Sequence, residues 1–584
     1  MPTAKMPSLI VSHMYGEDMK ISKILRRLQS ENNATAALEL CNKLEIGVRA
    51  QPNATYICRS FDLLMENMIT VLKQCPEECL EKASTIMGLM GYINRNDFPV
   101  YKNYVIKAYQ SCKSIRKYVM LALKTTFSCD AVNLDLSVYS ERFLAVLKVY
   151  LENAEIAGIF IAVSETITEF SKHYKRAFEV HFMDIVDIIV GWHLEVEQPA
   201  NLKLHCSVAL QQFAPYFLKE LDFTFRLLGQ FLEDIVTLGD EISHAPSPTD
   251  SLSGEVDAKN QQNKVELRIG CFIGAFNSIL KTLANRVEFV GMIVGHSIVN
   301  EAAMTISKTA EQTLTMTLAS EDTIMNINDF FCLLYTNSYD IINMVNIEEL
   351  IALQMKQLNL FSDAHKQSLL YLILCVFRQL RTQLPLSTVT LVFETTHNPL
   401  ATIKFTNNDK LRRLFLKVYH EILMIKNVPL LQETYRHVTA DMYNAIATLE
   451  AYDDDTATGQ ISKVLRAEAT LNFYLTALSA LATQTSSIIS MYALYPSILE
   501  LLITNCKAGA THLWLRHPTL HNALLSVLVV HCQKNHNFRP TSRLLREPLF
   551  APKHALDENN SPTSENFSLI LQFLAGILSA AKRD

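Results

Sequence analysis

The stretch Ser140–Glu152 reads SERFLAVLKVYLE, and its apolar residues recur every three or four positions. The apolar set shares one face of a helix with 3.6 residues per turn and consists of Phe143, Leu144, Leu147, Tyr150 and Leu151. The charged residues of the stretch fall outside that face. The pattern predicts an amphipathic helix, which must bury its apolar face against another element.

The same pattern returns in three later stretches, at residues 156–170, 182–190 and 227–235. Helix pairs begin near Ser140, His181 and Glu220, which is a spacing of about 40 residues. Tandem helix pairs with a period of about 40–47 are typical of HEAT and armadillo arrays. Because one pair cannot bury its apolar face alone, successive pairs stack and share a continuous core. The sequence therefore predicts an all-α fold, an α-solenoid of stacked antiparallel helix pairs in a HEAT- or armadillo-like superhelix.

The composition agrees with a large helical protein. The 584 residues include only 16 Gly and 18 Pro, which argues against β-sandwiches, barrels and Gly-rich nucleotide-binding folds. Hydrophobic residues make up 49% and charged residues 19%, so the chain is not a disordered polar one. The net charge of −6 argues against binding dominated by nucleic-acid phosphates, although direct contact with nucleic acid stays open.

Targeting signals are absent from the sequence. No apolar core of a secretory signal follows the first residues, and the longest apolar run, 369–377, is shorter than the roughly 17–25 residues of a membrane span. The 12 Cys contain no Cys-x-x-Cys pair, and the nearest two are Cys75 and Cys79. We expect reduced, mostly buried thiols and a soluble protein in the cytoplasm, with the nucleus as a second compartment and no membrane contact.

The predicted organisation has six segments: a flexible tail at 1–20, a helical array at 21–242, a disordered Ser/Pro/acidic loop at 243–263, a continued array at 264–537, a Pro-rich loop at 538–565, and a terminal helix at 566–584. The strand-like residues 387–393 are assigned to helix, because an isolated strand is improbable in such an array. The terminal helix is apolar where solenoids carry a polar cap. Either the natural protein continues beyond it or a partner covers this face.

Histidines near the C-terminus are the candidate metal ligands. His517 and His521 lie four residues apart and could share a helix face, but Pro518 between them indicates a helix start. His531 and His536 are five apart, beside Cys532, and no acidic third ligand is evident. We interpret them as ordinary, partly buried histidines, and an enzyme site assembled around them is the weakest hypothesis.

Two glycine spacings and three basic clusters have structural interpretations. The spacings Gly270-x-x-x-Gly274 and Gly291-x-x-x-Gly295 are expected to permit close helix stacking. The basic clusters, at Arg26–Arg27, Lys172–Arg176 and Arg412–Arg413, are interpreted as solvated outer helix faces. Only the second contains an aromatic residue, and one ring does not make a stacking platform for single strands. A concave basic stripe assembled from separate repeats stays an open alternative.

Nucleotide and hydrolase motifs are missing. The sequence has no phosphate-binding loop, no protein-kinase Asp-Phe-Gly or His-Arg-Asp element, and no Gly-x-Ser-x-Gly elbow. No catalytic, cofactor-binding or metal residue is therefore assigned, and no cofactor is expected in this chain. By itself the sequence is typical of a scaffold whose function lies on its surface.

Several collinear stretches carry a more specific resemblance: DIVDIIVGWH at 184–193, LLGQFLED at 227–234, EISH at 241–244, MIKNVPLLQETY at 424–435, YALYP at 492–496, HC at 531–532 and FSLIL at 567–571. In these the chain resembles the N-terminal helical array of the SMG-type phosphatidylinositol-3-kinase-related Ser/Thr kinases of nonsense-mediated mRNA decay. The resemblance runs from about Ile21 to the C-terminus and is most specific around Trp192 and Gln230.

The resemblance implies a scaffold within an ATP-dependent Ser/Thr protein kinase. The family's array resembles an arch that holds two regulatory subunits of the kinase complex, and the complex phosphorylates the up-frameshift RNA helicase, which would be an indirect partner. The kinase domain and its ATP and magnesium residues have no counterparts in this sequence, so enzyme status is left undecided. The alternative is a stand-alone HEAT adaptor or karyopherin-like transport scaffold.

One residue carries a stability expectation. Trp192, at the end of its predicted helix, is expected to be a buried anchor against the neighbouring helix. Truncation of a buried Trp to Ala costs about 3–5 kcal/mol.

Overall fold

The computed structural model describes residues 21–129, 139–243, 252–284, 297–315, 320–337, 346–357, 362–380, 383, 387–388, 392, 408–423, 428–451, 458–484, 503, 513–534 and 564–581. All regular elements in these ranges are α- or 3-10 helices, which confirms the all-α prediction. Residues 387, 388 and 392 are helical, as expected. The predicted tail at 1–20 and residues 538–563 of the predicted Pro-rich loop lie outside the described residues.

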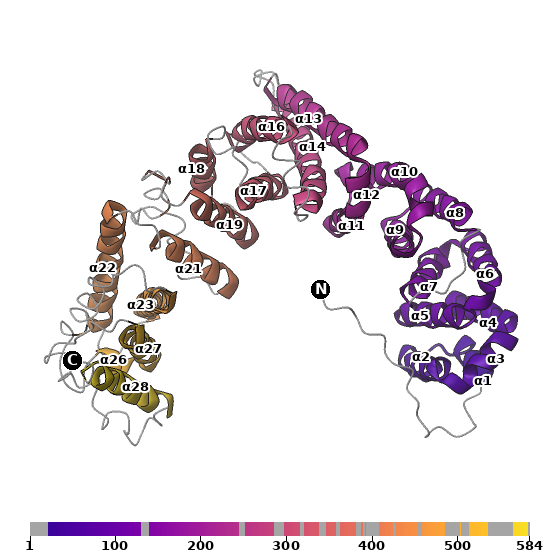
Figure 1. Ribbon diagram of the computed structural model, residues 1–584, viewed down its shortest axis with the longest axis horizontal. Helices are drawn as coiled ribbons and strands as arrows, with labels where there is room; N and C mark the ends of the chain where they lie inside the picture. The colour runs from indigo at the N-terminus through magenta and orange to yellow at the C-terminus, as the bar shows by residue number, and fades with distance from the viewer. Residues whose placement is uncertain are drawn as a thin grey trace. The chain divides into compact units, whose positions relative to one another are not determined.

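The chain divides into two compact units, residues 1–299 and 300–584. In the first unit, helices stack in two rows (Figure 1). The outer row consists of α1 (Ile21–Gln29), α4 (Phe61–Gln74), α6 (Phe98–Ser111), α8 (Ser140–Glu152), α10 (Lys175–Leu194) and α13 (Leu221–Ser243), with short α3 (Ala54–Arg59) and α12 (Ala214–Lys219). The inner row consists of α2 (Ala34–Arg49), α5 (Glu77–Ile93), α7 (Arg116–Ser128), α9 (Ala157–His173), α11 (Ala200–Gln212) and α14 (Leu252–Ala284).

The repeat period is as predicted. The inner helices α5, α7, α9 and α11 begin 39, 41 and 43 residues apart. Helix α8 begins at the predicted Ser140, whereas α10 begins at Lys175, six residues before the predicted His181. Between Ala200 and Lys219 the chain forms two helices, α11 and α12. Pro215 explains the break, because proline fits the first turn of a new helix but not a helix interior.

Aromatic side chains join successive repeats into one core. The rings of Phe98, Phe127, Phe143 and Phe170 come from α6, α7, α8 and α9, and their centroids lie 5.5–6.3 Å apart. Rings at these separations contact one another mainly edge-on, which is a favourable aromatic arrangement. The first unit is therefore held together across repeat boundaries, as a solenoid requires.

Two glycines of α5 permit close contacts with its neighbours, Gly88 with inner helix α7 and Gly91 with Tyr101 of outer helix α6. A Cβ on Gly88 of α5 would lie 2.3 Å from the carbonyl oxygen of Ala122 in α7, and a Cβ on Gly91 would lie 2.6 Å from the ring of Tyr101. The hydroxyl of Thr126 donates to the carbonyl of Gly88 across the same contact, at 3.0 Å. Only glycine leaves room for the backbone of α7 there. Of the glycines highlighted by sequence, Gly270 and Gly274 are buried in α14, and Gly291 and Gly295 lie outside the described residues.

The second unit repeats the arrangement. One row of helices packs in sequence and consists of α17 (Glu321–Thr336), α19 (Asp363–Leu380), α21 (Asp409–Leu423), α23 (Thr458–Gln484), α27 (Pro518–Lys534) and α28 (Ser564–Ala581) (Figure 1). Beside it are α16 (Ser297–Thr315), α18 (Ile347–Gln357), α22 (Val428–Ala451) and α26 (Leu513–Arg516). Hydrogen bonds and ion pairs between successive helices of the row join residues 41–45 positions apart, so the period persists.

The predicted loop 243–263 is wrong over its second half. Helix α13 ends at Ser243 and α14 already begins at Leu252, so residues 252–263 are helical. The segment after Gly254, EVDAKNQQNK, contains no Pro and is rich in straight-chain residues, which lose little rotamer freedom in a helix. Its polar composition is therefore compatible with the helix that forms there. The terminal helix α28 begins at Ser564, two residues before the predicted start.

One segment of the described chain, Gln261–Ala284, is long and apolar enough to cross a membrane by length and composition, and 78% of its window is buried. It belongs to α14, which packs against α10, α11 and α13. The apolar run 369–377 lies in α19 and is buried except at Tyr371. Packing between helices accounts for both apolar segments.

Candidate interaction surface

Ion pairs link successive inner helices of the first unit. Lys82 of α5 pairs with Glu45 of α2 at 2.5 Å, and Lys117 of α7 pairs with Glu81 of α5 at 3.2 Å. Burial alone would raise the pKa of Glu45, but hydrogen bonds from Lys82 and Arg49 outweigh it, so the pKa of Glu45 is lowered. The carboxylate therefore stays charged and ties its two helices together.

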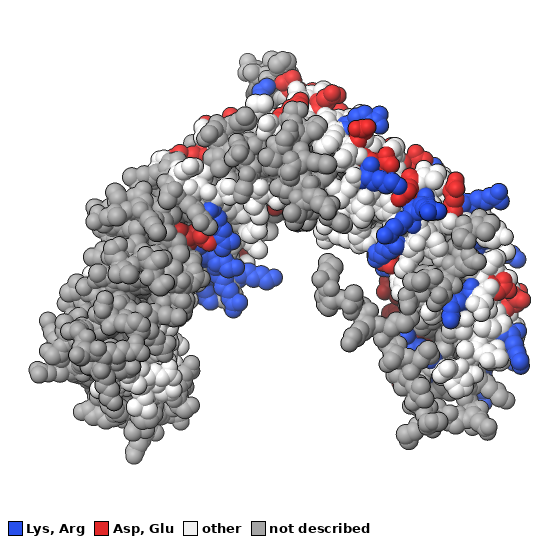
Figure 2. Space-filling model, in the orientation of Figure 1, with Lys and Arg blue, Asp and Glu red and all other residues white. Residues whose placement is uncertain are grey.

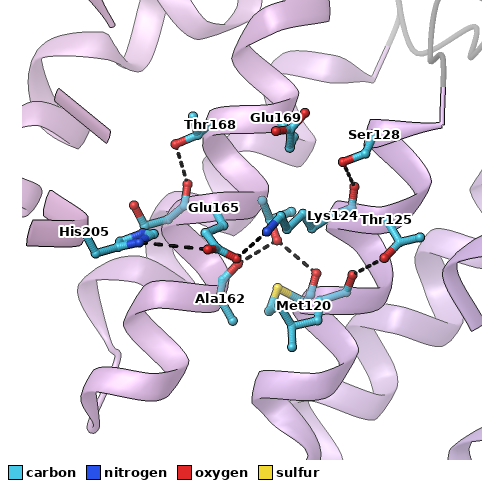
Figure 3. A network of polar contacts seen from close by, with 12 residues as sticks. Met120, Lys124, Thr125, Ser128, Ala162, Glu165, Thr168, Glu169 and His205 are labelled. Carbon is cyan, nitrogen blue, oxygen red and sulfur yellow. Dashed lines mark hydrogen bonds and ion pairs between the residues drawn. The ribbon is translucent and has the colours of Figure 1, made fainter. Parts of the chain in front are cut away.

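The ladder of pairs continues through α7, α9 and α11 (Figure 3). Lys124 Nζ donates to Glu165 Oε2 at 2.7 Å, and His205 Nδ1 lies 3.9 Å from Glu165 Oε1. Burial lowers the pKa of His205 more than Glu165 raises it, so the imidazole is mainly neutral at pH 7. The hydroxyl of Thr166 on α9 also donates to the carbonyl of Met120 on α7, at 3.0 Å. The inner row thus presents charges that are compensated by its own neighbours.

Apolar side chains stand exposed next to this ladder. Leu204 and Val208 lie one turn apart on α11 and are 66% and 41% exposed. Behind them, Lys203 Nζ lies 3.0 Å from Cys271 Sγ, and Ser278 donates to Ser207 at 2.9 Å, which ties α11 to α14. Exposed apolar residues on a rigid, charge-compensated surface are suited to contact with a partner protein. We call Leu204 and Val208 the α11 apolar pair.

Trp192 is not the buried anchor expected from sequence. It is half-buried at the end of α10, and its ring stacks on Phe160 of α9 with centroids 4.5 Å apart. The next residue, His193, is buried and its Nε2 lies 3.1 Å from Ser207 of α11, so only Trp192 of the two is partly exposed. The fully buried tryptophan is Trp514 of α26. Trp192, together with exposed Ile156 one turn before Phe160, therefore joins the candidate partner contacts.

The C-terminal histidines do not gather into one site. His517 precedes α27, which begins at Pro518 as predicted, and its Nδ1 contacts Glu468 of α23. His521 is buried in α27. His531 is in α27, but its side chain is not among those described, and His536 lies outside the described residues. Among described residues no group of three or more His, Cys, Asp or Glu is placed to hold a metal ion.

The basic clusters are solvated, with one difference between them. Arg26 and Arg27 are exposed on α1. Lys172 is exposed and pairs with Glu169 at 2.5 Å, and Lys175 and Arg176 are exposed at the start of α10. In the third cluster Arg413 is exposed, whereas Arg412 is half-buried. Solvation is confirmed for these exposed residues, but Lys172 lies on the inner-row helix α9, not on an outer helix as predicted.

A thiol pair in the second unit was missed by sequence reasoning. Cys332 of α17 and Cys375 of α19 are both buried and free. A hydrogen bond from Cys332, with help from Thr336 and Arg378, lowers the pKa of Cys375 to about 7 against the effect of burial, while the pKa of Cys332 is raised. The two cysteines are 43 residues apart, which is about one repeat period. In the sequence, only this spacing could have indicated that they lie side by side.

Comparison with known proteins shows which family the chain is similar to. A family model described as "Serine/threonine-protein kinase smg-1" matches residues 491–583. The Serine/threonine-protein kinase Smg1 of Drosophila melanogaster is 41% identical over 568 residues, which cover 97% of this chain and 16% of that protein. The Serine/threonine-protein kinase SMG1 of Danio rerio is 24% identical over 588 residues, with the same two coverages.

Among solved structures, importin beta crystallised in an ammonium sulfate condition aligns with a TM-score of 0.50 at 11% identity, over 96% of this chain and 62% of that one. At this identity the likeness shows the solenoid fold alone. The sequence relatives are more specific, and the chain spans only 16% of their length. The chain therefore matches an N-terminal region of the SMG1-type Ser/Thr protein kinases.

Proposed function

We propose that this chain is the N-terminal helical scaffold of an SMG-type kinase in nonsense-mediated mRNA decay. In this role it docks regulatory subunits of the kinase complex and positions a kinase domain that phosphorylates the up-frameshift RNA helicase. The observation that carries the proposal is the 41% identity to Drosophila Smg1 over 97% of the chain. ATP and magnesium would bind in the kinase domain, and the helicase would be an indirect partner.

The geometry supports docking as the scaffold's task. The inner row of the first unit is rigid, because ion pairs and hydrogen bonds link each helix to the next. The α11 apolar pair and the half-exposed Trp192 supply the apolar and aromatic surface at which binding energy concentrates in protein interfaces. We place the protein in the cytoplasm, with the nucleus as a second compartment.

The test is affinity purification of the tagged endogenous protein, followed by mass spectrometry. Recovery of a kinase domain on the same polypeptide, together with decay factors, is the expected result. A matched pair of variants locates the surface: Leu204→Glu with Val208→Glu on the inner row, and Val149→Glu with Val180→Glu, equally exposed on the outer row. Loss of the regulatory subunits from the inner-row variant alone supports the proposal.

The alternative is a karyopherin-like transport scaffold. The likeness to importin beta favours it only at the level of fold. Such a carrier would co-purify with a small GTPase and transport cargo, without decay factors. That outcome would refute the kinase scaffold and leave the solenoid standing.

A further inference from the structure

Helix α21 in the second unit carries exposed basic residues along one face. Its apolar face, Leu411, Phe415 and Val418, is buried. On the other side, Lys410, Arg413 and Lys417 are exposed at positions i, i+3 and i+7, which places them along one helix face. Figure 2 shows Lys and Arg atoms gathered over α21. We call these three residues the α21 cation stripe.

Among the described side chains, the stripe has no carboxylate partner. In the first unit, Lys82, Lys117 and Lys124 each pair with an acid on the neighbouring inner helix. None of the three stripe residues makes an ion pair within the described part of the chain. The acids of α21 are Asp409, whose side chain lies outside the described residues, and Glu421, which Arg378 of α19 engages at 2.6 Å.

The surroundings of the stripe add one more cation and one ring. Helix α19 packs directly against α21. Arg378 is held at the C-terminal end of α21 by Glu421, and Tyr371, 48% exposed, lies two turns earlier on α19. Among the described side chains, this surface is therefore cationic with one exposed aromatic residue.

We propose that the α21 cation stripe binds an acidic peptide segment of a partner protein. The charges would be complementary, because the stripe places three cations without a described carboxylate partner along about 10 Å of helix. A few residues of peptide carrying several carboxylates match that length. The proposal specifies the docking role proposed above, but it concerns the second unit and a binding event that does not require the kinase domain.

A single-stranded nucleic acid is the weaker occupant. Single-strand sites combine a long basic groove with several aromatic rings on which bases stack. The described side chains on the stripe and the neighbouring face of α19 supply three stripe cations and one exposed ring, Tyr371, on a chain whose net charge is −6. Three phosphate contacts would give weak, steeply salt-dependent binding.

The test uses the purified 584-residue chain and a fluorescein-labelled peptide of twelve glutamates, with binding followed by anisotropy at low salt. The stripe variant is Lys410→Gln, Arg413→Gln and Lys417→Gln. Its control, Lys172→Gln, Lys175→Gln and Arg176→Gln, removes the same charge from an exposed cluster in the first unit. We expect at least a tenfold loss of affinity in the stripe variant and less than a twofold change in the control, with unchanged circular dichroism in both.

Three outcomes would overturn the proposal. One is absence of peptide binding by the unmodified chain. Another is equal loss in the two variants, which would mean diffuse attraction to any basic surface. The third is tight binding of a single-stranded RNA 20-mer that depends on the stripe and is not displaced by the peptide. Failure here would leave the affinity-purification result untouched, and failure of that result would leave peptide binding measurable, so the two proposals are separable.

Discussion

Replacing Gly88 by Ala tests the tightest contact in the first unit. The added methyl group would lie 2.3 Å from the carbonyl oxygen of Ala122 and 2.6 Å from Cβ of Thr125. Ordinary contacts at these atoms are about 1 Å longer, and the closest atom is backbone, so α5 and α7 must separate. The hydrogen bond from Thr126 to the Gly88 carbonyl would lengthen with them.

The magnitude follows from two opposed terms. Overpacking a well-packed core costs about 1–3 kcal/mol and occasionally more. Alanine in place of glycine in a helix interior stabilises the folded state by up to about 1 kcal/mol. The net expectation for Gly88→Ala is a destabilisation of about 1–2 kcal/mol. Gly229→Ala on α13 is the matched control, because the nearest atom, Ile298 Cδ1, is 4.0 Å away, and only the stabilising term applies.

Urea unfolding monitored by hydrogen exchange is the assay, since it reports on α5 and α7 separately from the second unit. In Gly88→Ala, amides of α5 and α7 should exchange about tenfold faster, and in Gly229→Ala those of α13 should be slowed or unchanged. Equal protection in Gly88→Ala and the unmodified protein would refute the close approach of α5 to α7 described above.

Three further predictions follow from burial and charge. Trp514→Ala should cost about 3–5 kcal/mol, whereas Trp192→Ala, which loses mainly one ring contact, should cost about 1 kcal/mol; denaturant midpoints would contradict this if the two were equal. Burial lowers the pKa values of His193 and His365 to about 4. The unfolded chain then binds more protons below pH 6.5, so stability should be constant above pH 7 and fall by about 1.4 kcal/mol per pH unit for each histidine between pH 6.5 and 4; His193→Gln should flatten the fall for the first unit. Iodoacetamide should modify Cys375 with a half-point near pH 7 and Cys332 only at higher pH, and identical profiles by mass spectrometry would contradict the thiol hydrogen bond.

Several features were predictable because they depend on local periodicity. The apolar spacing in Ser140–Glu152 is one face of a helix whatever surrounds it, and α8 begins at the predicted residue. The period of about 40 residues follows from the need of each helix pair to bury its face against the next. Pro518 marks a helix start because its ring fixes the backbone there. The family resemblance was also readable, since it rests on matched residues along the chain.

Other features depend on which residues stacking brings together. Trp192 and Trp514 are chemically alike, and only the packing of neighbouring helices buries one and leaves the other half-exposed. By composition, the polar stretch 252–263 is compatible with either a loop or a helix. It forms a helix because it is continuous with the buried part of α14. The contact between Glu468 and His517 joins residues 49 positions apart, and no local sequence pattern predicts it.

The sequence by itself determined the fold class, the repeat period and the family resemblance, because these are encoded in side-chain periodicity and residue identity along the chain. The tertiary structure decided which charges are compensated and which are not. Lys124 and Lys410 are both lysines of row helices, yet Lys124 meets Glu165 one repeat away and Lys410 meets no described carboxylate. That difference arises only when helices about 40 residues apart pack side by side, and the proposed binding surface rests on it.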